Sequence, residues 1–366
     1  DVTNMSSIFN FPGENDLDWY VGDLSNWDVS NVTNMHYMFA GAGYKATNFN
    51  LGDLSNWDTG SVTKMSFMFA WAGQNSLEFN IGNLANWDTS SVTVMNDMFK
   101  ETGNHVTNLS LDLSGWDVSA VTTMENMFQN MGYNSTNFSI GNLDNWNTSK
   151  VTNMRSMFNQ TARYSTTFNI GNLNNWDVSK VTAMAYMFQN AGENATMFSI
   201  GDLSNWDTSN VTTMYAMFND AGYNSSIFNL GNLSNWDVSK VTSMAEMFSR
   251  AGHNASTWYI GDLSNWNTSE VNSMAYMFNN AGYYAETFDI GNLNNWDVSK
   301  VTKMSYMFNY AGYSATNDWY MDLMCWDAAK VTEHENFNTN VTDNIRRINI
   351  ILIRLVISYL LYIIII

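Results

Sequence analysis

The chain has 366 residues, of which 45% are hydrophobic and 15% aromatic, so it carries enough apolar material to build a folded core. Its 34 acidic residues outnumber its 15 basic ones, which gives a formal net charge of -19 at pH 7 and a pI of about 4.3. Such a charge repels nucleic-acid backbones and anionic lipid surfaces, and the single cysteine, Cys325, excludes an intrachain disulfide framework.

A tandem repeat begins at the first residues and fills most of the chain. Tryptophan recurs over the 299 residues from Trp27 to Trp326 at nine intervals of 30 residues and one of 29. The short interval precedes Trp116, where LSLDLSGW lacks the glycine of FNIGNLANW. A fixed period of this length is typical of a solenoid, in which each coil stacks on the next. We therefore predict a solenoid of eleven coils over residues 1–337.

The copies at the start and in the second half of the chain add detail to this repeat. The opening DVTNMSSIF matches the middle of the unit, so we expect the natural N-terminus, with any export signal or lipid anchor, to lie before residue 1. WDVSKVT recurs at Trp176, Trp236 and Trp296, whereas the copies at Trp206 and Trp266 carry Thr in place of Val. This alternation indicates a duplicated unit of 60 residues.

Each unit reads roughly FxIGNLxNWDxSxVTxMxxMFxxAGYxxxx and predicts two short elements. The FxI stretch alternates like a strand, and the Gly that follows it, with Asn or Asp, makes a corner. In the later TxMxxMFxxAG stretch, Met35, Met38 and Phe39 share one face at helical spacing. Thr33 can cap this helical turn and Gly43 can end it. We predict an α/β repeat solenoid with one short parallel strand and one short helical turn per coil of about 30 residues.

Stacking places equivalent residues of successive coils in columns, and two of these columns invite a functional interpretation. The Met and Phe columns could line a ligand groove, but their spacing favours the core. The residue after each tryptophan is usually acidic, as at Asp28, Asp58, Asp88 and Asp117, and a column of acids could hold calcium. Asn147 and Asn267 stand in the same column, which favours a structural Asx turn over a metal site.

No catalytic constellation emerges from the sequence. The four histidines, His36, His105, His253 and His334, lie in different columns and form no metal-ligand spacing with each other or with the cysteine. No nucleophile stands beside a base. We therefore expect neither an enzyme nor a bound cofactor or metal.

The residue after the glycine of AGY is the most informative variable position. Tyrosine recurs there or one residue later, at Tyr44, Tyr133, Tyr164, Tyr223, Tyr283 and Tyr313. An exposed column of tyrosines can bind a glycan or a protein, because Tyr gives contact area at a low entropy cost. The alternative is that the rings only pack over the loop of the next coil. We treat the six tyrosines as candidate ligand-binding residues.

Two stretches, NWDVSNVTNMHYMF and NWDTGSVTKMSFMF, resemble the repeat of BspA-like leucine-rich-repeat surface proteins, and in particular the repeat of unknown function typical of mycoplasma lipoproteins. The resemblance covers residues 1–337. It implies a leucine-rich-repeat-like solenoid on a bacterial or protist surface, in a group with members that bind host matrix proteins or other cells. The repeat here is a few residues longer, and its last copy, VTEHENF, places His334 and Phe337 where Met stands elsewhere.

These observations predict a cell-surface or secreted adhesion solenoid that recognises a host matrix protein, other cells or a glycan. The alternative is a structural spacer that has no ligand of its own. A binding protein should present a coherent exposed face, whereas a spacer should show scattered, interchangeable residues. The tyrosine column favours the binding protein.

The composition changes in the last part of the chain, residues 338–366. From Ile345 onward, ten of the last 22 residues are Ile, and three of the six arginines of the chain lie there. A membrane anchor is one interpretation, although only twelve residues follow Arg354, fewer than the ~20 that a spanning helix needs. An added hydrophobic strand and an artefactual, frameshifted end are the other two, so membrane association stays open.

Overall fold

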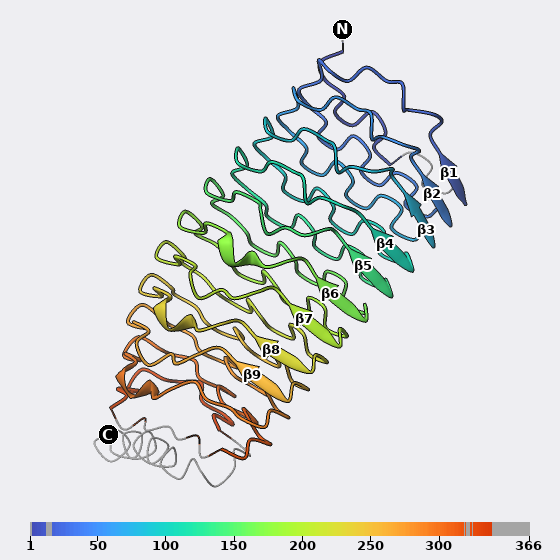
Figure 1. Ribbon diagram of the computed structural model, residues 1–366. Coiled ribbons are helices and arrows are strands. Elements are labelled where there is room, and N and C mark those ends of the chain that lie inside the picture. The colour runs from blue at the N-terminus through green and yellow to red at the C-terminus, as the bar shows by residue number, and fades with distance from the viewer. Residues whose placement is uncertain (1, 12–16, 318, 320–322, 324, 339–366) are drawn as a thin grey trace.

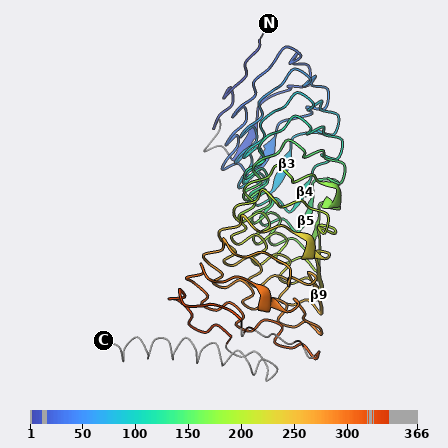
Figure 2. The ribbon, with the colours of Figure 1, turned by 90° about the vertical axis from the view of Figure 1, so that its left-hand side faces the viewer.

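The computed structural model describes residues 2–11, 17–317, 319, 323 and 325–338. Within them the chain forms a β-solenoid with coils of about 30 residues and almost no helix, stacked into an elongated body (Figures 1 and 2). Short strands recur along about eight turns of the solenoid. The predicted tandem-repeat solenoid is thus confirmed, while the predicted C-terminal tail lies outside the described residues from residue 339 onward.

One short strand per turn lies along one side of the solenoid (Figure 1). The strands are β1 (Asp18–Tyr20), β2 (Asn48–Asn50), β3 (Glu78–Asn80), β4 (Asn108–Ser110), β5 (Asn137–Ser139), β6 (Thr167–Asn169), β7 (Met197–Ser199), β8 (Ile227–Asn229) and β9 (Thr257–Tyr259). They pair in parallel with equivalent residues in register, as β1-β2-β3, β4-β5, β6-β7 and β8-β9. The middle residue of each strand faces the core and its two neighbours face solvent, which confirms the strand predicted from FxI.

A second line of parallel pairing runs through the VTxM segment. It consists of single bridges between equivalent residues, from Asn4 with Asn34 to Lys303 with Glu333. Both segments of the repeat therefore pair between coils, and this second line continues past the places where neighbouring strands do not pair, as between β7 and β8. The bridge at Glu333 shows that the last, altered copy still continues the stack.

The predicted helical turn is wrong. In its place, backbone N–H groups alternate between two partners: that of Met38 donates to Met35 O (3.1 Å) in the same coil, and that of Tyr37 donates to Ser66 O (3.1 Å) in the next. The N–H and the hydroxyl of Thr33, expected to cap a helix, both donate to the carbonyl of Thr3. An isolated helical turn of this length is marginal, whereas each bond to the next coil adds to the stacking of the solenoid.

Three short 3-10 helices, η1 (Leu173–Asn175), η2 (Leu233–Asn235) and η3 (Leu293–Asn295), follow one another at 60-residue intervals. Each begins after an Asn whose side chain accepts a bond from the N–H two residues on. These are the copies that carry WDVSKVT, so the 60-residue alternation seen in the sequence also appears in the backbone.

Columns of identical side chains fill the core. Trp57 and Trp87 stack with ring centroids 6.1 Å apart, and the indole N–H of Trp57 donates to Leu24 O (2.9 Å). The same bond recurs from coil to coil up to Trp326, while stacked Phe and buried Met columns fill the remaining interior. The Met and Phe columns are therefore core, as the sequence favoured.

The acidic column after the tryptophans forms turns. Asp28 Oδ1 accepts the N–H of Ser30 (3.1 Å), and Asn147 Oδ1 accepts the N–H of Ser149 (3.2 Å) in the same way. The hydroxyl of Ser30 also donates to Asp28 Oδ1 (2.6 Å), and this bond together with the one from the N–H holds the pKa of Asp28 below its usual range. Among the residues that the structure describes, no group of three His, Cys, Asp or Glu is placed to hold a metal ion. In the same part of the chain, no helix is long and apolar enough to cross a membrane.

Candidate functional site

Three columns of the turn-rich segment change from coil to coil, while the buried Met and Phe columns between them stay almost constant. The first contains Tyr37, Phe67, Asp97, Asn126, Ser156, Tyr186, Ala216, Glu246, Tyr276 and Tyr306. The second contains Trp71, Glu101, Asn130, Gln160, Asn190, Asp220, Arg250, Asn280 and Tyr310. The third contains Tyr44, Gln74, Asn104, Tyr133, Arg163, Glu193, Tyr223, His253, Tyr283 and Tyr313. We call the surface that they form the variable face.

The backbone of the variable face is unusual. Of the described residues, 23 that are not glycine have a positive φ, and all of them except Ala162 lie in the first two columns or in equivalent positions of the end coils. The left-handed conformation costs a side-chain-bearing residue about 1–2 kcal/mol, and glycine avoids this cost. Nevertheless bulky residues such as Trp71 (φ 59) and Tyr276 (φ 60) stand there. Strained positions of this kind are typical of functional surfaces.

The C-terminal half of the third column is an aromatic stack. The ring centroids of Tyr223 and His253 lie 4.5 Å apart, those of His253 and Tyr283 4.8 Å, and those of Tyr283 and Tyr313 4.9 Å. His253, which was not among the predicted binding residues, completes this stack. Because the rings cover each other's faces, their edges and hydroxyl groups are what the stack can offer a ligand.

The other three candidate tyrosines lie elsewhere. Tyr133 and Tyr164 meet edge to face at 5.2 Å, and the guanidinium of Arg163 lies over both rings at 5.6 and 5.5 Å. Tyr44 contacts Phe11 at 6.1 Å near the N-terminal end. Of the six candidates, Tyr164 and Tyr313 are exposed and the other four are half-buried. The structure thus gathers three of them in one stack and two around Arg163.

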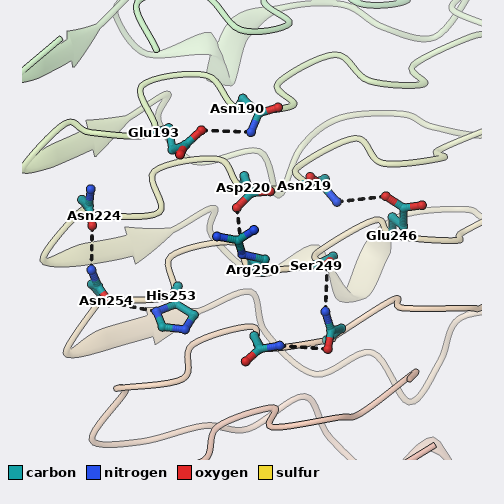
Figure 3. A network of polar contacts seen from close by, with 12 residues as sticks. Asn190, Glu193, Asn219, Asp220, Asn224, Glu246, Ser249, Arg250, His253 and Asn254 are labelled. Carbon is teal, nitrogen blue, oxygen red and sulfur yellow. Dashed lines mark hydrogen bonds and ion pairs between the residues drawn. The ribbon is translucent and has the colours of Figure 1, made fainter. Parts of the chain in front are cut away.

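A network of polar contacts lies on the variable face (Figure 3). Asp220 Oδ1 lies 3.1 Å from Arg250 Nε, and the guanidinium of Arg250 covers the ring of Tyr223 at 4.8 Å. Glu246 accepts bonds from the hydroxyl of Tyr215 (2.8 Å) and the amide of Asn219 (3.1 Å). We did not predict this network, because its members are spread over several columns and each appears in a single coil. One signal could have revealed these residues: their positions vary from coil to coil, while the Met and Phe positions beside them do not.

A ladder of asparagines borders the stack. The side-chain amide of Asn224 donates to Asn194 Oδ1 (2.7 Å), and that of Asn254 donates to Asn224 Oδ1 (2.6 Å). Asn254 also contacts Nδ1 of His253 (2.8 Å), as Figure 3 shows. Burial lowers the pKa of His253, which favours the neutral form of the ring. The stack is therefore held in position by uncharged amide groups along its flank.

Asp220 is the most perturbed acid on this face. Asp220 is only 8% exposed, and this burial raises the pKa of its carboxyl group to about 6. The positive charges of Arg250 and Arg163 favour the charged form and oppose this rise. The neighbouring carboxylates of Glu193 and Glu246 raise this pKa further. The folded chain then binds more protons than the unfolded chain between about pH 4 and pH 6, so stability falls as the pH rises through that window.

We therefore expect Asp220→Asn to raise the free energy of unfolding at pH 7 by up to about 3 kcal/mol, because the amide removes a carboxylate whose burial raises its pKa to about 6. Urea unfolding followed by circular dichroism at pH 4 and at pH 7 measures this. The free energy of unfolding should differ less between pH 4 and pH 7 in this variant than in the wild type. Asp207→Asn, at an exposed position, controls for the change in net charge. An equal pH dependence in wild type and Asp220→Asn would contradict the prediction.

The comparisons with known proteins add one family. The model described as "Mycoplasma protein of unknown function, DUF285" matches residues 1–75, 44–161, 104–221, 129–255 and 223–349. No curated protein and no solved structure matches the chain.

Proposed function

The chain belongs to the DUF285 family of Mycoplasma repeat proteins, and from this premise we propose that it is a binding or adhesion solenoid, displayed on a cell surface or secreted. Its partner in this proposal is an extracellular protein or a glycan, and the variable face is the surface that recognises it. The proposal assigns the chain no catalytic activity, no cofactor and no nucleic-acid partner.

One observation carries the proposal: the strained backbone positions of the first two columns carry varied side chains instead of glycine. If the side chains of the first two columns served no purpose, glycine would be the residue of lowest conformational cost at each of them. Between residues 37 and 310, Gly41 is the one residue of these two columns that is a glycine. Tyr, Trp and Arg, which stand there or in the third column, are the residues that most often dominate protein interfaces.

Three finer points belong to the same proposal. We infer that the repeat is related to BspA-like leucine-rich repeats, on the resemblance of WDxSxVTxMxxMF, and that the solenoid has eleven coils, on its eleven regularly spaced tryptophans. The acidic charge supports a partner that is neutral or basic. A structural spacer is the competing function, and it predicts that the variable face can be altered without consequence.

The test is binding of the full chain to an array of glycans and extracellular-matrix proteins, beside a variant with Tyr223, His253, Tyr283 and Tyr313 all changed to Asn. Asn occupies this column at Asn104, so the variant should fold. We expect saturable binding by the wild type and a loss of at least about tenfold in affinity in the variant, because the aromatic contacts of the interface disappear.

The control changes Asn48, Asn108 and Asn137 to Thr, which is the residue of that strand column in β6 and β9. Binding should survive in this control. A well-folded wild-type chain that binds nothing on the array, or a Tyr/His variant that binds as well as the wild type, would favour the spacer or another face.

A further inference from the structure

A groove of about 570 Å³ lies on the strand side of the solenoid, between β7, β8 and β9. Its apolar lining includes Met197, Ile227 and Tyr259, which are 67%, 51% and 44% exposed. Its polar lining includes Asp202 and Asn232. The volume falls within the range of about 300–1,000 Å³ that is usual for ligand sites. This groove, which we call the strand groove, lies apart from the variable face.

The strand groove lies where the ladder of strands is interrupted. β7 pairs with β6, and β8 pairs with β9, but β7 and β8 do not belong to the same sheet. Between them, the N–H of Phe198 donates to the hydroxyl of Ser225 (3.0 Å), and that hydroxyl donates to the carbonyl of Ile227 (2.7 Å). A serine side chain thus takes the place of a direct bond between the two strands.

The apolar residues of the strand groove depart from their columns. The column of Met197 and Ile227 carries Thr in the coils on either side, at Thr167 and Thr257. The column of Tyr259 carries Asn at Asn229. Three neighbouring coils therefore replace polar residues by exposed apolar ones at one place, which is the mark of an interaction site rather than of scattered surface residues.

The charge around the strand groove has one sign. The strand-and-corner segments from residues 17–26 to residues 286–295 number ten, and together they hold ten acidic residues and no Lys or Arg. Within the groove, Asp202 supplies a carboxylate of which Oδ1 accepts the N–H of Ser204 (2.9 Å). A ligand that places a cation beside Asp202 and an apolar group on Met197 would meet no like charge on this side.

We propose that the strand groove binds a peptide segment of a partner protein in which Lys or Arg stands next to aliphatic residues. The aliphatic side chains lie on Met197, Ile227 and Tyr259, and the cation lies at Asp202. This inference rests on the proposed binding function and adds a second recognition surface to it. The apolar side chains of the strand groove and the carboxylate of Asp202 distinguish it from the aromatic and amide groups of the variable face.

The experiment measures fluorescence anisotropy of labelled acetyl-Leu-Lys-Leu-Lys-Leu-amide with the full chain. The groove variant combines Met197→Thr, Ile227→Thr, Tyr259→Asn and Asp202→Asn, each of which installs the residue of the same column in a neighbouring coil. Folding should persist because Asn232 makes the same turn bond that Asp202 makes, at 3.0 Å to Ser234 N. The control variant, Leu77→Thr with Tyr20→Asn, removes exposed apolar groups (59% and 62% exposed) outside the groove.

We expect the groove variant to bind the peptide at least about tenfold more weakly than wild type, and the control to bind it equally well. Acetyl-Leu-Glu-Leu-Glu-Leu-amide should not bind. If acetyl-Ser-Lys-Ser-Lys-Ser-amide binds as tightly as the Leu-Lys peptide, a diffuse acidic field explains the binding and the proposal fails. Absence of peptide binding, or equal binding by the groove variant, also overturns it. None of these outcomes changes the array result, so the proposed function is tested separately.

Discussion

Replacing Trp206 by Ala is expected to lower the free energy of unfolding by about 3–5 kcal/mol, the usual cost of removing a large buried aromatic side chain. Trp206 is 2% exposed and stacks on Trp236 with 6.1 Å between ring centroids. Its indole N–H donates to Leu173 O at 2.9 Å, so the residue links its own coil to the coil before it. Each coil of a solenoid is stabilised only by its neighbours, and a cavity here weakens two interfaces at once. The shift of the urea midpoint, followed by circular dichroism, measures the loss.

Two further variants separate the contributions to this effect. Trp206→Phe keeps a ring in the stack but loses the indole donor, and we expect it to cost about 1 kcal/mol beyond the change in volume. Leu173 O keeps the backbone N–H of Trp176 as a partner (3.1 Å), which limits that cost. Trp27→Ala, at a partly buried position in the first described coils, should be milder than Trp206→Ala. Equal losses at Trp27 and Trp206 would show that burial in the column does not set the stability.

The repeat made much of the architecture predictable. Because equivalent residues stack, the period of tryptophan was enough to infer the solenoid, and the alternation around Phe49 was enough to place the strand. The turn formed by Asp28 could also be predicted, since Asn147 stands in its column. All three inferences depend on interactions that every coil repeats, and repetition is what the sequence of a single chain displays directly.

The helical turn could not be excluded in this way. The spacing of Met35, Met38 and Phe39 fits a helix, but the same three residues are also buried when N–H groups alternate between the same coil and the next. Period alone does not distinguish these two backbones. The hydrogen bonds between coils decide which backbone forms. The N–H of Tyr37 donates to Ser66 O in the next coil, and an isolated segment has no such partner.

The candidate site was only partly predictable for a related reason. The tyrosines stood out because one residue type recurs, and three of them do form a stack through His253. The pair of Asp220 with Arg250, and the strand groove at Met197, each arise in a single place from residues that break the repeat. A departure from a column has no periodic signal, so its partners become visible only once the register of the coils is known.

Gly192→Ala is expected to lower the free energy of unfolding by about 2–5 kcal/mol. Gly192 has a φ of +50°, a conformation that costs a residue with a side chain about 1–2 kcal/mol. An added Cβ would lie 2.5 Å from Cβ and 2.7 Å from Cγ of Phe168, which is buried in the Phe column. Overpacking of this kind adds about 1–3 kcal/mol. Gly52→Ala is the matched control, since Gly52 also has a positive φ (+76°) but its Cβ would meet only Gly22 O, at 3.9 Å.

Ala162 shows what the coil must do to accept that methyl group. It occupies the column of Gly192 with a φ of 48°, and the rings of Phe138 and Phe168 beside it stand 6.5 Å apart. In the coil of Gly192, the centroids of Phe168 and Phe198 are only 5.3 Å apart. The Phe stack must therefore open by about 1 Å to admit a Cβ, and it loses dispersion contacts when it does. Urea midpoints for the two Gly variants show why this column requires glycine. An equal loss of stability in Gly192→Ala and Gly52→Ala would mean that backbone conformation requires it, and not the Phe stack.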